Sequence, residues 1–254
     1  MPDQITVTED GHVAVIEINR PPANYFDRGL IAQIVAAAAG LQAGGTRAIV
    51  LCSEGKHFCA GANFASGEMA ADRERAAQDL YREAVRMFEI AVPVIAAVQG
   101  SAVGGGLGLA CAADFRVASP SARFHANFSA LGFHQGFGLS VTLPAIVGLQ
   151  QAMELLYTSR RIGGQRALEI GLVDRLVPDG TQRSEAIAWA AEIAGCAPLA
   201  VQSMKQTLRG PLARQVRAVL ERELAEQARL WATEDSAAGI AASLAREKPV
   251  FSGR

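Results

Sequence analysis

Residues 93–114 could do chemistry through the backbone alone. They begin with a short apolar run that contains branched residues, the pattern of a strand covered on both faces. Gly104, Gly105 and Gly106 follow, and then an apolar sequence typical of a helix. If a helix begins at Gly105 or Gly106, its first amides lack partners inside the helix and carry the positive end of its dipole. Such a turn predicts a site for a phosphate, a carboxylate or a carbonyl oxygen that becomes an oxyanion.

A second turn of small residues lies earlier in the chain, at 53–63. It also follows an apolar run, and Ala60, Gly61 and Ala62 leave its backbone amides uncovered. Two such turns, each after a buried strand, could bring two amide donors to one point, which is what a developing oxyanion requires. Two unrelated packing turns are the alternative interpretation. A membrane helix over 93–114 is disfavoured because a proline and the glycine cluster interrupt it.

The composition restricts the class of protein. The chain has 254 residues, enough for one large α/β domain or two small ones, with 50% hydrophobic residues, 19% charged residues and a formal net charge of −1. A nucleic-acid-binding protein would show clustered Lys and Arg, which this balance does not favour. The low charged fraction and the alanine-rich helical segments predict that other subunits cover part of the apolar surface. We therefore expect self-association, with no nucleic acid and no membrane as partner.

The cysteines and the N-terminus indicate the compartment. Cys52, Cys59, Cys111 and Cys196 are scattered without a CxxC pair, so we expect neither a disulfide framework nor a metal site. The N-terminal residues lack a basic region followed by an apolar core, the pattern of an export signal. These features predict a cytoplasmic protein.

Strand and helix patterns alternate over most of the chain, which predicts an α/β fold. Apolar residues on either side of the Asp10–Gly11 turn signal predict a hairpin. Asp27 can cap a helix that ends near Gly44. Further segments are expected as helices at 71–90, 139–147, 150–158 and 164–171, and as strands at 48–52, 114–118 and 172–178.

The chain from Thr181 onward has a helical pattern, with expected breaks at 195–198 and at Gly210–Pro211. This region is richer in alanine than the rest and has no strand pattern. We therefore expect a core over 1–194 and a helical C-terminal region over 195–254 that serves docking or oligomerisation.

Five segments together resemble the crotonase superfamily, also called the enoyl-CoA hydratase/isomerase family, over essentially the whole chain. They are NRPPAN (19–24), KHFCAGAN (56–63), PVIAAVQGSAVGGGLGLACAAD (93–114), SRRIGGQRALEIGLVDRLVP (159–178) and REKPVFSGR (246–254). The resemblance implies a spiral of ββα units, with a helical C-terminal region that makes the contacts of a trimer or of a dimer of trimers. It also implies an acyl-CoA thioester as substrate, with CoA as part of that substrate and no separate cofactor.

The same resemblance assigns roles to individual residues. By position, the backbone amides of Ala60 and Gly105 would form an oxyanion hole for the thioester carbonyl. The residues that it places along the CoA and substrate path are Ala23, Gly61, Ala62, Asn63, Arg246 and Lys248. For the last two, which would approach the CoA phosphates, charges of a solvent-exposed tail are an equally open interpretation.

The chain departs from the family pattern where the resemblance places the catalytic carboxylates. Hydratases of the familiar type use two glutamates to activate water, and Gly108 and Phe128 stand at those positions. A position that is acidic in some isomerases matches Gly136. General acid–base catalysis contributes about 10²–10⁴-fold, and neither glycine nor phenylalanine transfers a proton. Phe128 would instead make the wall of the substrate pocket more apolar.

His134 is the first candidate for a substitute acid or base, because imidazole titrates near neutrality. A histidine packed or hydrogen-bonded in its loop is the competing interpretation. Weaker candidates are His125, Ser129, Gln135, Ser140, Tyr81 and Glu68. We expect an acyl-CoA enzyme of the hydratase/isomerase type, and keep open another acyl-CoA reaction, such as isomerisation or thioester hydrolysis, or a CoA-thioester-binding protein without activity.

Overall fold

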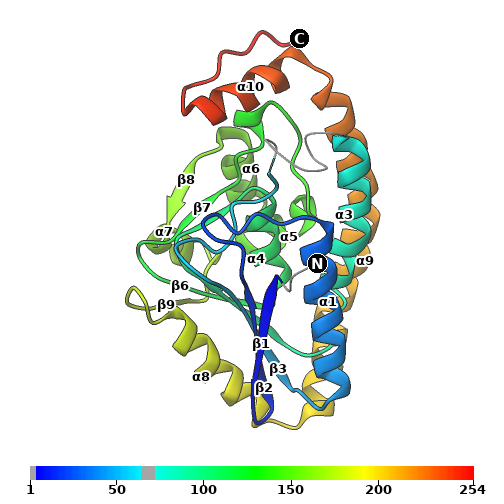
Figure 1. Ribbon diagram of the computed structural model, residues 1–254, viewed down its shortest axis with the longest axis vertical. Coiled ribbons are helices and arrows are strands. Elements are labelled where there is room, and N and C mark those ends of the chain that lie inside the picture. The colour runs from blue at the N-terminus through cyan, green and yellow to red at the C-terminus, as the bar shows by residue number, and fades with distance from the viewer. Residues whose placement is uncertain (1–3, 64–71) are drawn as a thin grey trace.

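The computed structural model describes residues 4–63 and 72–254, which form two sheets with helices around them (Figure 1). In these ranges the larger sheet has six strands in the order β1-β2-β3-β4-β6-β9. The strands are β1 (Ile5–Asp10), β2 (Val13–Ile18), β3 (Ala48–Ser53), β4 (Val94–Val98), β6 (Phe115–Ala118) and β9 (Arg175–Leu176). β1 and β2 form the expected antiparallel hairpin, and the later strands run parallel to β2.

The central strands are buried on both faces, as their continuous apolar sequences predict. Every residue of β3 and β4 is buried. Alternate side chains of β3 point to opposite faces: Ile49 and Leu51 join the larger core, whereas Ala48 and Val50 join a second cluster under helix α8 (Gln182–Ala194). The sheet is therefore a rigid platform, and the chain that leaves its strand ends is held in place.

A smaller sheet stands beside the larger one. Its strands are β5 (Ser101–Val103), β7 (Arg123–His125) and β8 (Arg161–Gly163). β5 follows β4 and leads into helix α4 (Gly105–Ala112), and β7 follows β6 in the same way. Cys59, after β3, makes an isolated bridge to Ala102 of β5. Successive units thus add one segment to each sheet, which confirms the expected spiral of ββα units.

The helices begin and end near the expected residues. Asp27 caps α1 (Arg28–Ala43) by accepting a hydrogen bond from the Leu30 amide at 2.9 Å, and Gly44 ends it. In the described ranges the other helices before α8 are α3 (Arg73–Met87), η1 (Ser129–Leu131), α5 (Leu139–Val147), α6 (Leu149–Thr158) and α7 (Gly164–Glu169). No helix in the described ranges is both long and apolar enough to cross a bilayer.

The C-terminal region differs from the expectation at one point. The predicted break at Gly210–Pro211 is wrong, because α9 runs uninterrupted from Pro198 to Trp231. A proline inside a helix removes one hydrogen bond. The following turns bury Val216 and Leu220 against α3 and α5, and this packing outweighs the loss. Helix α10 (Glu234–Ala245) follows. α8 ends at Ala194, and the division of the chain into two functional regions there stays a prediction.

Candidate active site

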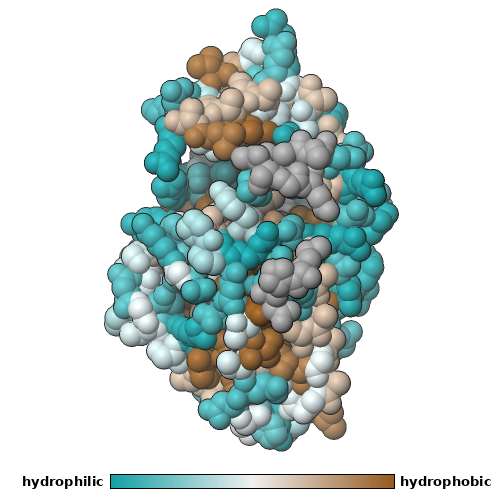
Figure 2. All heavy atoms as spheres, viewed as in Figure 1, coloured by the Kyte–Doolittle hydropathy of each residue, from teal (hydrophilic) through white to brown (hydrophobic). Residues whose placement is uncertain are grey.

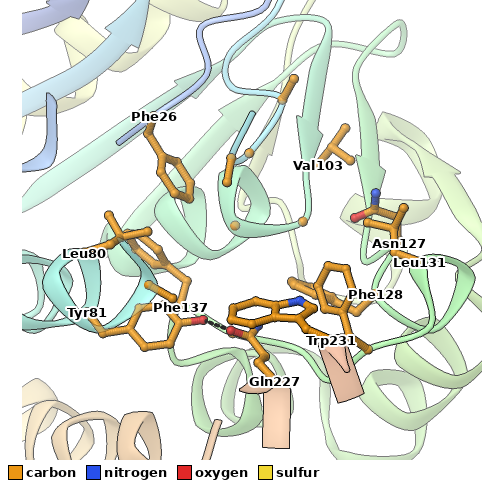
Figure 3. A pocket seen from close by; sticks show the side chains of 18 residues that line it. Phe26, Leu80, Tyr81, Val103, Asn127, Phe128, Leu131, Phe137, Gln227 and Trp231 are labelled. Atoms are coloured by element: carbon orange, nitrogen blue, oxygen red, sulfur yellow. Dashed lines mark hydrogen bonds between the residues drawn. The ribbon is translucent and has the colours of Figure 1, made fainter. Parts of the chain in front are cut away.

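A pocket opens between the two glycine-rich turns and the end of α9 (Figure 3). Its walls come from the turn after β3, the start of α4, the loop over 127–137 and helices α3 and α9. The volume within the described walls is about 60 Å³, which is room for a few water molecules or a short acyl group. The wall is predominantly apolar and includes the rings of Phe26, Phe128 and Phe137.

The two turns lie against each other because β5 binds the chain after β3. The Cys59 amide donates to the Ser101 carbonyl at 3.0 Å, and the Val103 amide donates to the Cys59 carbonyl at 3.0 Å. Gly61 has a φ of +87°, and a Cβ there would lie 2.8 Å from the Val103 oxygen and 3.5 Å from the Gly105 nitrogen. Only glycine therefore allows this turn to approach the N-terminus of α4 so closely.

The amides at the pocket differ from the predicted pair by one member. Gly105 is the first residue of α4, so its amide has no acceptor within the helix, as expected. The Ala60 amide, in contrast, donates to the Ala23 carbonyl at 3.0 Å and is occupied. The Ala62 amide donates to no acceptor in the described part of the chain, and Ala62 lines the pocket. The geometry thus favours Ala62 and Gly105 as the donor pair in place of Ala60 and Gly105.

Asn24 holds the first of these turns in place, and sequence reasoning missed it. Its side-chain amide donates to the carbonyls of Glu54 at 2.8 Å and His57 at 2.6 Å, and its Oδ1 accepts from the Arg20 amide at 3.0 Å. The side chain is fully buried. It fixes Ala23, whose carbonyl occupies the Ala60 amide, so the signal for this role was the asparagine that ends the NRPPAN segment.

Aromatic side chains fill the space where the resemblance places the missing carboxylates. A Cβ on Gly108 would lie 2.7 Å from the Cβ of Phe137, so Phe137 occupies the room of the first glutamate. Phe128 itself lines the pocket and packs edge-on against Phe133, with ring centroids 6.1 Å apart. A Cβ on Gly136 would lie only 1.9 Å from the hydroxyl oxygen of Tyr81. The pocket is therefore packed around these replacements.

The polar side chains opposite the two turns come from α3 and α9. Tyr81 donates its hydroxyl proton to Oε1 of Gln227 at 2.8 Å, and Nε2 of Gln227 donates to the His134 carbonyl at 3.0 Å (Figure 3). Burial, followed by the charge of Glu223, raises the pKa of Tyr81 above its usual range, so the phenol stays neutral. Tyr81 is the one ionisable side chain among the described lining residues.

Known proteins resemble this chain along nearly its whole length. The sequence profile of the family described as enoyl-CoA hydratase/isomerase matches residues 8–254. The chain belongs to the enoyl-CoA hydratase/isomerase family. It is 32% identical to a probable enoyl-CoA hydratase of Mycobacterium bovis over 98% of this chain and 99% of that one. A probable enoyl-CoA hydratase of Bacillus subtilis is also 32% identical, over 98% of both chains.

Solved structures agree with this membership. The crystal structure of an enoyl-CoA hydratase/isomerase from Pseudoalteromonas atlantica T6c superimposes with a TM-score of 0.86 at 28% identity, and it covers 98% of this chain and 100% of that one. An enoyl-CoA hydratase from Bacillus anthracis superimposes with a TM-score of 0.77 at 31% identity, over 99% and 100%. The crotonase-like α/β fold is thus confirmed.

His134, the predicted acid or base of this family member, lies outside the pocket lining. Its Nδ1 is 2.8 Å from the carbonyl of Gln135. Its charge acts on Glu226 at the surface of α9, whose pKa is lowered first by Arg229 and to a smaller extent by His134. The imidazole therefore does not line the pocket, and a role of His134 as acid or base stays a prediction.

Of the weaker candidates that the structure describes, only Tyr81 lines the pocket. Three others are engaged elsewhere: His125 with the Ser159 carbonyl at 2.8 Å, Ser129 with the Leu156 carbonyl at 2.9 Å, and Gln135 with the Ser140 hydroxyl at 3.0 Å. Glu68 lies outside the described residues. Burial raises the pKa of the Cys59 thiol to about 12, so this cysteine beside the turn is no thiolate nucleophile.

The residues assigned to the CoA path divide into two groups. Gly61 and Ala62 line the pocket, and Asn63 follows them as the last described residue before 72. Arg246 and Lys248 lie in the exposed segment after α10 and do not line it.

Glu223 is a buried carboxylate on α9 that supports the pocket wall. It accepts hydrogen bonds from the amides of Gly138 at 2.8 Å and Ser140 at 2.9 Å, at the start of α5. Burial raises the pKa of Glu223 to about 7, although the bonds from Ser140 and Gly138 oppose the shift. Above neutrality the carboxyl of Glu223 is therefore charged, and this buried charge lowers the free energy of unfolding.

We expect this cost to appear in the pH dependence of unfolding. A pKa that burial raises from 4.5 to about 7 corresponds to roughly 3 kcal/mol. The contribution is fully present below pH 4.5, where Glu223 is protonated in both states, and is lost as pH rises to about 7. Urea unfolding should show the wild-type protein losing roughly this amount relative to Glu223→Gln between pH 4.5 and 7.5. Glu221→Gln, at an exposed position of α9, is the control, and parallel profiles for wild type and Glu223→Gln would contradict the prediction.

Proposed function

We propose that this protein binds an acyl-CoA thioester and polarises its carbonyl oxygen between the backbone amides of Ala62 and Gly105. The observation that carries the proposal is that these two amides lack acceptors in the described chain and border one apolar pocket. An oxygen that gains negative charge, in an enolate or a tetrahedral adduct, is stabilised by two such donors. Removing one donor from an oxyanion hole typically costs about 10²–10³-fold in rate.

The surrounding residues strengthen these donors in two ways. α4 adds the positive end of its dipole at Gly105. The rings of Phe26, Phe128 and Phe137 exclude water, so the two amides act in a medium of low dielectric constant. Because the groups are fixed by the turns, little reorganisation is needed when charge develops on the substrate oxygen.

The reaction that follows is proposed to differ from glutamate-dependent hydration. The rings of Phe137 and Phe128 fill the places where the resemblance puts the two carboxylates. No carboxylate or imidazole is among the described lining residues. A proton must then move between substrate and water, or the chemistry must generate the enolate without removing a C–H proton. The same observation favours a second candidate, a protein that binds acyl-CoA without turning it over.

Proton exchange separates these candidates. We expect the protein to bind crotonyl-CoA and butyryl-CoA but to leave the enoyl absorbance of crotonyl-CoA unchanged. Exchange of the α-protons of butyryl-CoA in heavy water, followed by proton NMR, would identify an enzyme that stabilises an enolate. Binding without exchange would identify the second candidate, and absence of binding would exclude both.

His134→Ala is expected to leave acyl-CoA affinity and any α-proton exchange within about twofold of wild type, because its imidazole does not line the pocket. His12→Ala, at an exposed turn of the β1–β2 hairpin, is the matched control. A loss of exchange in His134→Ala alone, with affinity retained, would restore His134 as a proton-transfer group.

We also propose that CoA runs past Ala23 and Asn63 and that Arg246 and Lys248 approach its phosphates, in the same or a neighbouring subunit. Their exposure and positive charge support this role. The assembly proposed is a trimer or a dimer of trimers. Leu199, Met204 and Leu208 on the first half of α9 are 79%, 62% and 77% exposed, and apolar side chains also gather over α10 (Figure 2). A monomer mass in sedimentation equilibrium would exclude the assembly.

A further inference from the structure

Four neutral polar side chains line the pocket, and two of them satisfy each other. The hydroxyl of Tyr81 donates to Gln227, and the Gln227 amide donates to the His134 carbonyl. The hydroxyl proton of Tyr81 and one of the two Nε2 protons of Gln227 are therefore already engaged within the protein. The remaining two are Asn127 and Trp231, and no hydrogen bond of either side chain to another described residue is found.

The indole nitrogen of Trp231 is the exceptional group. It is buried and has no acceptor in the part of the chain that the structure describes. Buried indole N–H groups usually find a partner, because an unpaired buried donor is costly. Figure 3 shows the nitrogen on the edge of the ring that is turned toward the interior of the pocket, between Phe128 and Gln227. We therefore expect the acceptor for this N–H group to belong to a ligand that fills the pocket.

The ring is held in this orientation from two sides. Phe133 packs against it edge-on, with centroids 5.8 Å apart and an interplanar angle of 67°. The guanidinium carbon of Arg73 lies 5.8 Å from the ring centroid. A donor on a ring that cannot turn freely is prearranged, so a ligand acceptor that meets it gains a hydrogen bond without ordering the side chain.

We propose that Trp231 determines substrate specificity by donating its indole N–H to an oxygen of the acyl group beyond the thioester carbonyl. This inference rests on the proposed function, in which the amides of Ala62 and Gly105 take the thioester oxygen. The substrate class is then a short-chain acyl-CoA with a keto or hydroxyl oxygen, rather than a purely hydrocarbon acyl-CoA.

The surroundings define that oxygen further. No cationic side chain is among the described lining residues, and Arg73 lies over the face of the Trp231 ring instead of lining the pocket. A neutral carbonyl or hydroxyl oxygen therefore fits better than a carboxylate, which would be desolvated without a counter-charge in the pocket. Asn127, on the opposite side of Phe128 in Figure 3, offers a second neutral polar group. The volume of about 60 Å³ favours a short acyl chain.

A pair of thioesters that differ in one oxygen tests the proposal. The chain has two tryptophans, so Trp189→Phe leaves Trp231 as the only indole. Trp189 lies on α8 against Phe115 and Arg175, outside the pocket, which makes it a matched control. In this background we would titrate 3-oxobutyryl-CoA and butyryl-CoA and follow both the dissociation constant and the emission of Trp231.

We expect 3-oxobutyryl-CoA to bind about 5- to 100-fold tighter than butyryl-CoA, since only it gives the buried donor an acceptor. Its binding should shift the emission of Trp231 to longer wavelength, and butyryl-CoA should not. In the otherwise wild-type chain, Trp231→Phe should reduce the preference to within about twofold, because it removes the donor that distinguishes the two thioesters.

Other results would overturn the inference in distinct ways. Equal binding of the two thioesters, or a preference that survives Trp231→Phe, would show that the indole is no specificity group. If Trp231→Phe weakened the binding of both thioesters equally, the indole N–H would donate to a part of the ligand that both thioesters share. If neither thioester binds wild type, the proposed function itself fails. Should Trp231→Phe not fold, the emission of Trp231 in the Trp189→Phe protein still decides, because an equal shift with both thioesters overturns the proposal.

Discussion

Gly61→Ala is expected to reduce acyl-CoA chemistry by at least about 100-fold, the effect of losing one donor of an oxyanion hole. The new Cβ would lie 2.8 Å from the Val103 oxygen, and the φ of +87° is strained for alanine. Both problems are relieved only by moving the turn away from α4. Such a movement separates the Ala62 amide from the Gly105 amide, and a single substrate oxygen then no longer reaches both.

The rate of α-proton exchange in heavy water measures this effect, and acyl-CoA titration measures it if the protein only binds. Gly40→Ala is the matched control, because a Cβ on Gly40 in α1 meets nothing within 4 Å. Alanine there should stabilise the helix by roughly 0.5–1 kcal/mol and leave the pocket unchanged. Wild-type exchange and affinity in Gly61→Ala would show that the close approach of the two turns is not what creates the site.

Gly108→Glu is expected to lower the free energy of unfolding by about 3 kcal/mol or more and to produce no hydratase. The substitution puts a Cβ 2.7 Å from the Cβ of Phe137, and overpacking of this kind typically costs about 1–3 kcal/mol. The carboxyl is also brought among buried apolar side chains without a partner, which adds a desolvation cost. The further substitution Phe128→Glu is expected to lower the free energy of unfolding more, because it also brings a carboxyl among buried apolar side chains without a partner.

A double-mutant cycle in urea unfolding tests the steric part of this explanation. Phe137 has a φ of +59°, so Phe137→Gly removes the ring at a backbone conformation that glycine readily adopts. In that background the further cost of Gly108→Glu should be smaller by more than about 1 kcal/mol. Additive costs, or rapid crotonyl-CoA hydration by the single variant Gly108→Glu, would show that Phe137 does not exclude the glutamate.

Elements that rest on local signals could be predicted from the sequence. The Asp10–Gly11 hairpin, the Asp27 cap and the start of α4 at Gly105 each depend on residues within a few positions of one another, and all three are confirmed. The break at Gly210–Pro211 was wrong because the packing of α9 on α3 and α5 is invisible in the local pattern.

In the site, too, local features could be predicted from the sequence, whereas features that depend on distant segments could not. That the two small-residue turns meet was one of two open interpretations of their positions after buried strands, and the bridge between Cys59 and Ala102 supports it. Which amide stays uncovered did not follow, because the carbonyl that occupies Ala60 comes from Ala23 in a distant segment. Gln227 and Trp231 were missed for a similar reason, since nothing in the sequence of α9 says that its far end returns to the first half of the chain.

The contribution of α9 to the pocket has a consequence for biosynthesis. Both amide donors have left the ribosome once residue 105 has emerged, but Gln227 and Trp231 are made more than a hundred residues later. Until α9 docks, the nascent chain exposes the apolar wall that includes Phe128, Phe133 and Phe137, and such surfaces favour aggregation and chaperone binding. During synthesis the pocket can therefore close only after α9 has emerged, and a chain interrupted before Glu223 would lack the wall that Gln227 and Trp231 supply.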